Sequence, residues 1–289
     1  MNSERSSPNS QVADPADNIV QGNNEFTLDL YSHLARSGSS NLFFSPYSIS
    51  SALAMTFAGA CGETEQEMAS VLRFPTKQDR LHTAFSKLNE QIFAGENQGY
   101  KIKAANRLWG QKGYRFGAEF LQLLRTRYGS DLGQLDFGGH PENACRKINQ
   151  WVEDQTAGKV TNLISPKALG EVTRLLLVNA IYFKGTWTTT FEESGTKEAP
   201  FHIDLSNKIK VQMMHQQTEC AYANVGGVQV LDLPYGNQDL SMIVLLPNRV
   251  DGLAELEAAL SVSNVNQWLT ALSPQPIEVF LPKFRLTEQ

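Results

Sequence analysis

The sequence predicts an α+β fold in which helices pack against a mainly antiparallel sheet. Helical periodicity dominates the first half of the chain, whereas short strand-like runs follow one another after residue 200. Separate runs of helices and then of strands favour this class over alternating βαβ units. The 289 residues suffice for one large domain or two modest ones, and neither an internal repeat nor a linker-like stretch divides them.

Amphipathic helices are predicted where apolar residues recur at intervals of three or four. The first contains Phe26, Leu30 and Leu34 and stops near Gly38. The clearest helix start is Ser45-Pro46, because serine suits the N-cap and proline suits the first turn. Further helices are expected at 63–72, 81–92, 116–124, 141–158, 253–260 and 265–272.

Strands are predicted where the period changes to two or where an apolar run is short. Residues 101–109 alternate, as in a strand with one covered face. The run from Arg174 to Lys184 is almost continuously apolar, which predicts a central strand covered on both faces. Pro234–Asn237 is the expected hairpin turn. Shorter strands are expected at 201–203, 208–213, 228–233, 240–246 and 277–286.

Composition and charge argue against two classes of partner. The chain is 41% hydrophobic and 19% charged with a net charge of −5, and an acidic balance disfavours nucleic acid and anionic membranes. No apolar run is long enough to span a bilayer. We therefore predict no nucleic-acid and no membrane partner. Five basic residues lie close together in the sequence, namely Lys101, Lys103, Arg107, Lys112 and Arg115. Aromatic residues and glycines interrupt them, so we interpret them as solvated side chains in preference to a polyanion-binding site.

The N-terminus and the cysteines bear on the compartment. Residues 1–18 are rich in Ser, Asn, Asp and Pro and predict a disordered tail before a domain over residues 19–289, with no signal-peptide pattern. The three cysteines, Cys61, Cys145 and Cys220, are far apart and show no metal-binding spacing, which indicates free thiols. These features favour a cytoplasmic or a bacterial protein over a disulfide-rich secreted one.

No sequence pattern predicts an enzyme. The GxSxG, HExxH, P-loop and GxGxxG motifs are absent. Ser45 has two possible roles, as a nucleophile or as a helix N-cap. We prefer the N-cap. Glu192 and Glu193 follow a strand and are interpreted as a solvated turn and not as an acid/base pair. We predict no catalytic residue, no metal ligand and no cofactor.

Asn179 is the most informative polar residue, because it lies in the middle of an apolar run. Burying an amide is costly unless it finds a hydrogen-bond partner. A neighbouring loop is one possible partner. The sharper hypothesis is a buried polar cluster of Asn179 with Ser45 and Ser48 that holds strands in one of two arrangements, since such a network is strong when complete and costly when broken.

These residues lie in segments that resemble the serpin family. The resemblance runs from about Phe26 to Leu286, and the segments agree with the family in order and spacing. The segments are Asn41–Ser50, Ile148–Lys159, Leu177–Trp187, Val211–Met214 and Leu281–Phe284. The resemblance implies a serpin-like single domain, with helices around a large, mainly antiparallel sheet and smaller sheets.

The resemblance also implies a function and a set of site residues. Serpins inhibit serine proteases, and in some cases cysteine proteases, through a reactive loop that inserts into the large sheet after cleavage. By position, Asn41, Ser45, Ser48 and Asn179 resemble the polar cluster where the sheet opens. Trp187 and Lys283 resemble the top of the sheet, where insertion begins.

The sequence departs from the family pattern after Leu281-Pro-Lys-Phe284. In serpins the hinge, the reactive loop and the last strands follow this segment, so we expect the reactive-site bond and the C-terminal strands to be absent from these 289 residues. The chain alone is then expected not to inhibit, and to self-associate through an unpaired edge along Arg174–Lys184. The alternatives are a non-inhibitory serpin-like binding protein or an inactive fragment. The family also has extracellular members, so the resemblance leaves that compartment open.

Overall fold

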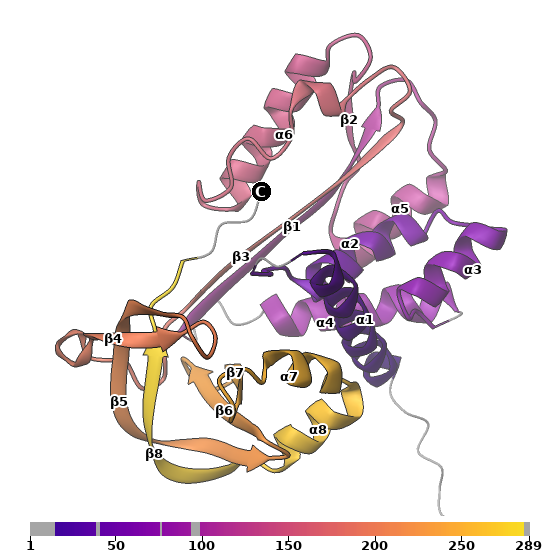
Figure 1. Ribbon diagram of the computed structural model, residues 1–289. Coiled ribbons are helices and arrows are strands. Elements are labelled where there is room, and N and C mark those ends of the chain that lie inside the picture. The colour runs from indigo at the N-terminus through magenta and orange to yellow at the C-terminus, as the bar shows by residue number, and fades with distance from the viewer. Residues whose placement is uncertain (1–14, 39–40, 76, 94–98, 286–289) are drawn as a thin grey trace, which may run out of the picture.

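The computed structural model describes residues 15–38, 41–75, 77–93 and 99–285, and it has the predicted α+β architecture (Figure 1). The helices are α1 (Pro15–Ser37), α2 (Pro46–Phe57), α3 (Gly62–Val71), α4 (Gln78–Phe93), α5 (Ala118–Tyr128), α6 (Pro141–Gln155), α7 (Leu253–Ala259) and α8 (Val262–Thr270). The strands are β1 (Tyr100–Gln111), β2 (Gly133–Leu135), β3 (Leu175–Gly185), β4 (Lys197–His202), β5 (Lys208–Val225), β6 (Val228–Tyr235), β7 (Leu240–Pro247) and β8 (Ser273–Pro282).

The first sheet has three strands in the order β2-β1-β3. β1 pairs antiparallel with β3 over nearly its whole length and parallel with the short β2. The prediction that 174–184 is a central strand covered on both faces is wrong. β3 pairs with β1 alone among the described strands, and Ile181 and Phe183 in its second half are 36% and 43% exposed. The apolar run from 174 to 184 therefore reflects partial burial under helices. It does not indicate a neighbouring strand on each edge of β3.

The second sheet is built around β5, which continues 12 residues beyond the predicted strand end at Met213. One edge of β5 pairs with β4 and then with β6, while β8 pairs along the other edge. β6 and β7 form the predicted hairpin. Helices α7 and α8 pack on the β6–β7 end, where Trp268 and Leu256 are buried with Val230 (Figure 1).

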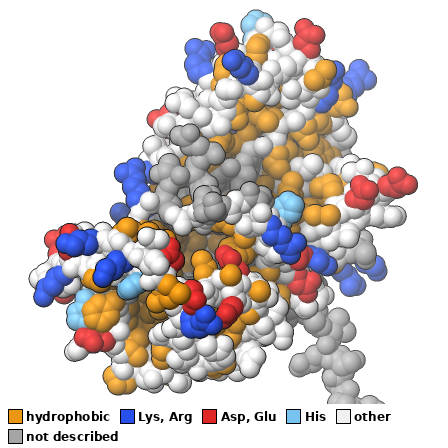
Figure 2. Space-filling model, in the orientation of Figure 1, with side chains coloured by type: hydrophobic (Ala, Val, Ile, Leu, Met, Phe, Trp, Pro, Cys, Tyr) orange, Lys and Arg blue, Asp and Glu red, His pale blue; other side chains and the backbone are white. Residues whose placement is uncertain are grey.

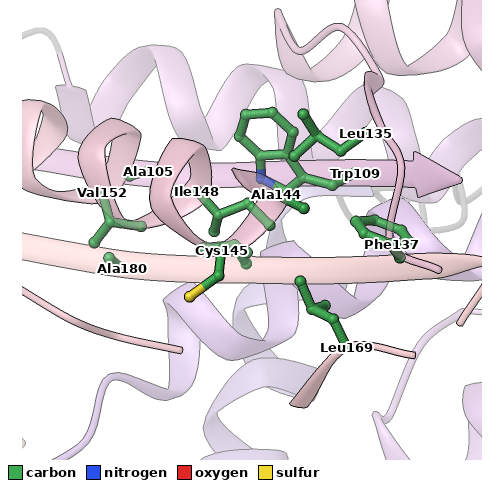
Figure 3. Close-up of a cluster of buried hydrophobic side chains, with 11 residues drawn as sticks. Ala105, Trp109, Leu135, Phe137, Ala144, Cys145, Ile148, Val152, Leu169 and Ala180 are labelled. Carbon is green, nitrogen blue, oxygen red and sulfur yellow. The ribbon is translucent and has the colours of Figure 1, made fainter. Parts of the chain in front are cut away.

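Helix α6 covers one face of the three-stranded sheet. Ile148 and Val152 of α6 are fully buried against Trp109 of β1 and Ala180 of β3 (Figure 3). The guanidinium carbon of Arg107 lies 4.3 Å from the centre of the Trp109 ring, which keeps this basic residue on the covered face. Because successive side chains of a strand point to opposite faces, the residues next to Trp109 and Ala180 point away from α6.

Helices α1, α2 and α4 form a second core on the opposite face of this sheet. Phe57 of α2 and Leu81 and Phe85 of α4 are completely buried. His82 of α4 is also buried, and its Nδ1 lies 2.7 Å from the hydroxyl of Tyr128. Small residues occupy much of α2, which lets the helix approach the strands closely.

Contacts between distant parts of the chain tie the two halves together. The hydroxyl of Tyr31 in α1 donates a hydrogen bond of 2.7 Å to Oε1 of Glu257 in α7. Burial, followed by this bond to a carboxylate, raises the pKa of Tyr31 to about 12. The helical and strand-rich halves are therefore joined through side chains 226 residues apart.

Several boundary predictions need adjustment. Helix α1 begins at Pro15, so the described part of the predicted 1–18 tail, residues 15–18, is helical, while 1–14 lie outside the described residues. β8 begins at Ser273, four residues before the predicted start, and the predicted strand end at Leu286 lies outside the described residues. The three cysteines have free thiols. Within the described ranges, no helix combines the length and apolarity needed to cross a membrane.

Candidate sheet-opening site

The site begins at the N-terminus of α2. Ser45 is the N-cap, in an extended conformation, and its Oγ accepts a hydrogen bond of 3.4 Å from the backbone N–H of Ser48. Pro46 occupies the first turn, where a missing N–H costs nothing. This local geometry follows from the Ser-Pro pair, and it directs the side chain of Ser48, which is 0% exposed, toward the sheet.

Asn179 of β3 reaches down to this turn. Its Nδ2 donates to Oγ of Ser48 at 2.6 Å and to the carbonyl oxygen of Ser48 at 3.0 Å. The same amide also donates to Oδ1 of Asn106 on β1. We call Ser48, Asn106 and Asn179 the polar cluster. It joins one helix to two strands through a single side-chain amide.

The sequence-predicted members of this site are only partly brought together. Ser45 contacts Ser48 through the helix cap, and Ser48 contacts Asn179 directly. Asn41 is exposed and makes no hydrogen bond with these three residues. Sequence reasoning missed Asn106, which lies directly opposite Asn179 in the β1–β3 register. The sequence did offer a signal for Asn106. It lies on the face of the predicted strand 101–109 that was expected to be covered.

Trp187 lies just beyond the C-terminal end of β3, and Lys283 directly follows the end of β8. The Trp187 ring stacks on Tyr235, with centroids 4.4 Å apart, and the two residues form an isolated β-bridge. Phe183 contacts the same tyrosine edge-on at 5.1 Å. Lys283 is exposed, its backbone N–H donates to the carbonyl of Gln212, and it does not stack on the Trp187 ring. The rings of Phe183, Trp187 and Tyr235 thus connect β3 to β6, whereas Lys283 extends the β5–β8 pairing.

The chemistry of the site is structural. Ser45 Oγ accepts from a backbone amide and makes no hydrogen bond with a histidine in the described chain, so it lacks the base that an activated serine needs. The described residues contain no group of three or more His, Cys, Asp or Glu side chains placed to bind a metal ion. The arrangement holds α2 against β1 and β3.

The Ser45→Ala variant tests the helix-cap interpretation. We expect the free energy of unfolding to fall by about 1 kcal/mol, because the N–H of Ser48 loses its acceptor. Urea denaturation followed by circular dichroism measures this change. Ser261→Ala is the matched control, since Ser261 caps α8 in the same way and lies far from the polar cluster in sequence. Loss of a hydrolytic activity in Ser45→Ala alone would contradict a purely structural Ser45.

Comparison with known proteins places the chain in a family. The family model described as "Serpin (serine protease inhibitor)" matches residues 21–289. The leukocyte elastase inhibitor of Xenopus tropicalis is 37% identical over 279 residues, which cover 94% of this chain and 74% of that protein. The human leukocyte elastase inhibitor is 38% identical, with 93% and 73% coverage. Antithrombin-III of Ovis aries is 36% identical, with 93% and 60% coverage.

Solved structures agree with the sequence comparison. Ovalbumin from emu (Dromaius novaehollandiae) superposes with a TM-score of 0.87 at 30% identity, covering 91% of this chain and 73% of ovalbumin. The structure titled "Cleaved Serpin 42Da" gives a TM-score of 0.85 at 30% identity, with 93% and 72% coverage. The chain therefore belongs to the serpin (serine protease inhibitor) family.

Proposed function

We propose that this protein contributes the sheet-opening body of an inhibitor of serine proteases. The polar cluster supports the proposal, because it attaches the N-terminal turn of α2 to both β1 and β3. The two N–H groups of the Asn179 amide are shared among three acceptors, so the two contacts with Ser48 are lost together when β3 moves away from α2. Relatives named leukocyte elastase inhibitor support serine proteases as the target class. Cysteine proteases are a second class to be included in the test.

The proposal assigns no catalytic role to the chain. An inhibitor of this kind is attacked by the protease and needs a strand-accepting sheet more than a nucleophile of its own. The edge of β3 supports this role, since it carries backbone groups that an added strand can pair with. Trp187 and Tyr235 would cover the end of β3 at which an added strand first pairs.

A protease panel tests the proposal. The 289-residue chain is incubated with elastase-, trypsin- and papain-type proteases, alone and after co-expression with the part of the human leukocyte elastase inhibitor that the chain does not match. We expect a covalent, SDS-resistant complex in the second arm and cleavage without a complex in the first. Asn179→Leu in the second arm should change the ratio of complex to cleaved product. Cleavage without a complex in both arms would refute inhibition and favour a binding role.

We further propose that the chain self-associates through the open edge of β3. Ile181 and Phe183 on this strand are partly exposed, and edge strands with apolar side chains recruit other chains. Figure 2 shows hydrophobic side chains among charged ones at the end of the molecule formed by β4, β5 and β8. Phe280 of β8 is 59% exposed. Together these surfaces favour association between copies.

Sedimentation velocity tests self-association. We expect concentration-dependent oligomers of the chain, and we expect Ile181→Lys to reduce them, because a charge on an edge strand opposes pairing. Val172→Lys is the matched control, since Val172 is 88% exposed and lies outside β3. A monodisperse monomer at all concentrations, or equal effects of the two variants, would contradict the proposal.

The compartment is also a proposal. We propose that the protein acts in the cytoplasm, which is supported by three free cysteines, two of them buried. Fractionation of cells that express the untagged protein from its own start codon tests this location, and recovery from the medium would contradict it.

A further inference from the structure

The two faces of the β1–β3 ladder differ in charge. Neither strand contains Asp or Glu, and their only charged residues are Lys101, Lys103, Arg107 and Lys184. Successive residues of a strand point to opposite faces, and the register places all of these cations on the face that α6 covers. The opposite face, which carries the polar cluster, has no charged side chain. The protein therefore concentrates positive charge on one side of this strand pair.

Three of these cations gather on the part of the face that the core under α6 does not reach. This core extends along the ladder to Ala105 of β1 and Ala180 of β3 (Figure 3). Lys103 is the next residue of β1 on this face, and Lys101 follows it. Lys101 lies directly opposite Lys184 of β3, and both are exposed. We call Lys101, Lys103 and Lys184 the lysine cluster.

The pairing of Lys101 with Lys184 brings two positive charges together. Residues directly opposite each other in an antiparallel pair have Cβ atoms about 5 Å apart, and like charges there are destabilising. Lys103 lies about 7 Å further along the same face. Neither Lys103 nor Lys184 forms an ion pair with a described residue. An anion that contacts these side chains would therefore relieve a repulsion within the folded chain.

Arg107 adds charge to the same face without being available for contact. Its guanidinium carbon lies 4.3 Å from the centre of the Trp109 ring and 5.7 Å from the centre of the Trp151 ring. Its Nε is buried and makes no hydrogen bond with a described residue. A cation held beside two aromatic rings raises the positive potential over the face, and the lysines remain to contact a ligand.

We propose that the lysine cluster binds a compact anion with two or more phosphate groups. Lysine ammonium groups bind phosphate as point charges, and three flexible side chains can converge on one such ligand. A long polyanion would extend past the cluster over a protein whose net charge is −5, so a compact ligand is favoured. The ligand bridges β1 and β3 and stabilises this strand pair. The proposal does not depend on protease inhibition, and its test requires no protease.

Isothermal titration calorimetry with inorganic triphosphate at low ionic strength tests the site. We expect one triphosphate per chain, and we expect Lys184→Gln and Lys103→Gln each to weaken binding about tenfold, because each removes a charged donor. Lys197→Gln is the matched control, since Lys197 is an exposed lysine on β4 and should leave the affinity unchanged. Failure of triphosphate to bind the unmodified chain, unchanged affinity in Lys184→Gln, or equal weakening in Lys184→Gln and Lys197→Gln would overturn the proposal.

A comparison of ATP with triphosphate, both without a metal ion, distinguishes two sources of the phosphate groups. Tyr182 lies directly opposite Lys103 on the same face and offers a ring on which a base can stack. Tighter binding of ATP that is lost in Tyr182→Leu would identify a nucleotide as the ligand. Equal binding of the two compounds would show that the site recognises the phosphate groups alone.

Thermal unfolding provides a readout that does not depend on calorimetry. Without ligand, Lys184→Gln should raise the Tm at low ionic strength, because it removes the repulsion with Lys101, and salt should reduce the difference. Triphosphate should raise the Tm of the unmodified chain more than that of Lys184→Gln. A ligand-free Lys184→Gln variant with a lower Tm than the unmodified chain, or an equal effect of triphosphate on both, would contradict the proposed site.

Discussion

Replacing Asn179 by leucine should lower the free energy of unfolding by about 1–3 kcal/mol. Leucine has a similar size but no donor, so Oγ and the carbonyl oxygen of Ser48 lose an amide partner, and Oδ1 of Asn106 loses the same one. Unsatisfied buried acceptors, and not a cavity, cause the loss. Urea denaturation of the variant and the unmodified chain, at a concentration where both are monodisperse, measures it.

A double-mutant cycle distinguishes the free energy that the polar cluster contributes from a general destabilisation of β3. Ser48→Ala combined with Asn179→Leu should cost less than the sum of the single changes, because both remove the same 2.6 Å hydrogen bond. Asn149→Leu is the matched control, since Asn149 also bonds through its side chain but on α6, to Ile164. Additive effects of Ser48→Ala and Asn179→Leu would show that the two residues are not coupled.

Acidification should destabilise the protein through His82. Burial, opposed in part by the nearby Asp79 carboxylate and assisted by Arg127, lowers the pKa of His82 to about 4. The unfolded chain has a histidine pKa near 6.5 and takes up the proton first. Stability is therefore unaffected above about pH 6.5 and falls as the pH drops toward 4, by about 3 kcal/mol in total.

Substitution identifies the contribution of this histidine. His82→Gln removes the titration, so the dependence of unfolding free energy on pH between 6.5 and 4 should become flatter than in the unmodified chain. His202→Gln is the control, since His202 is exposed on β4. An equal slope in the His82→Gln variant would show that other groups cause the acid sensitivity.

The parts of the fold that depend on residues adjacent in the sequence could be predicted. The start of α2 at Ser45-Pro46, the α6 helix and the β6–β7 turn follow from local chemistry, and each occurs where it was expected. The length of β5 could not be predicted, because its second half is stabilised by β6 and β8 from later in the chain. β2 is three residues long and leaves no periodicity to detect.

The candidate site shows the same division. An asparagine inside an apolar run indicated a buried amide, and the helix cap placed Ser48 near it. The third member, Asn106, depends on the β1–β3 register, which pairs residues 73 positions apart. The edge position of β3 also depends on which strands pair with it, and hydrophobicity alone does not distinguish an edge strand under two helices from a central strand.

The bond between Tyr31 and Glu257 has a consequence for protein synthesis. Its two residues are 226 positions apart, so a ribosome that adds about 5–20 residues per second exposes α1 for tens of seconds before α7 exists. During that interval, the surface of α1 that contacts α7 lacks its partner. We expect the hydrogen bond between α1 and α7 to form only after α7 has emerged from the exit tunnel, late in the folding of the chain.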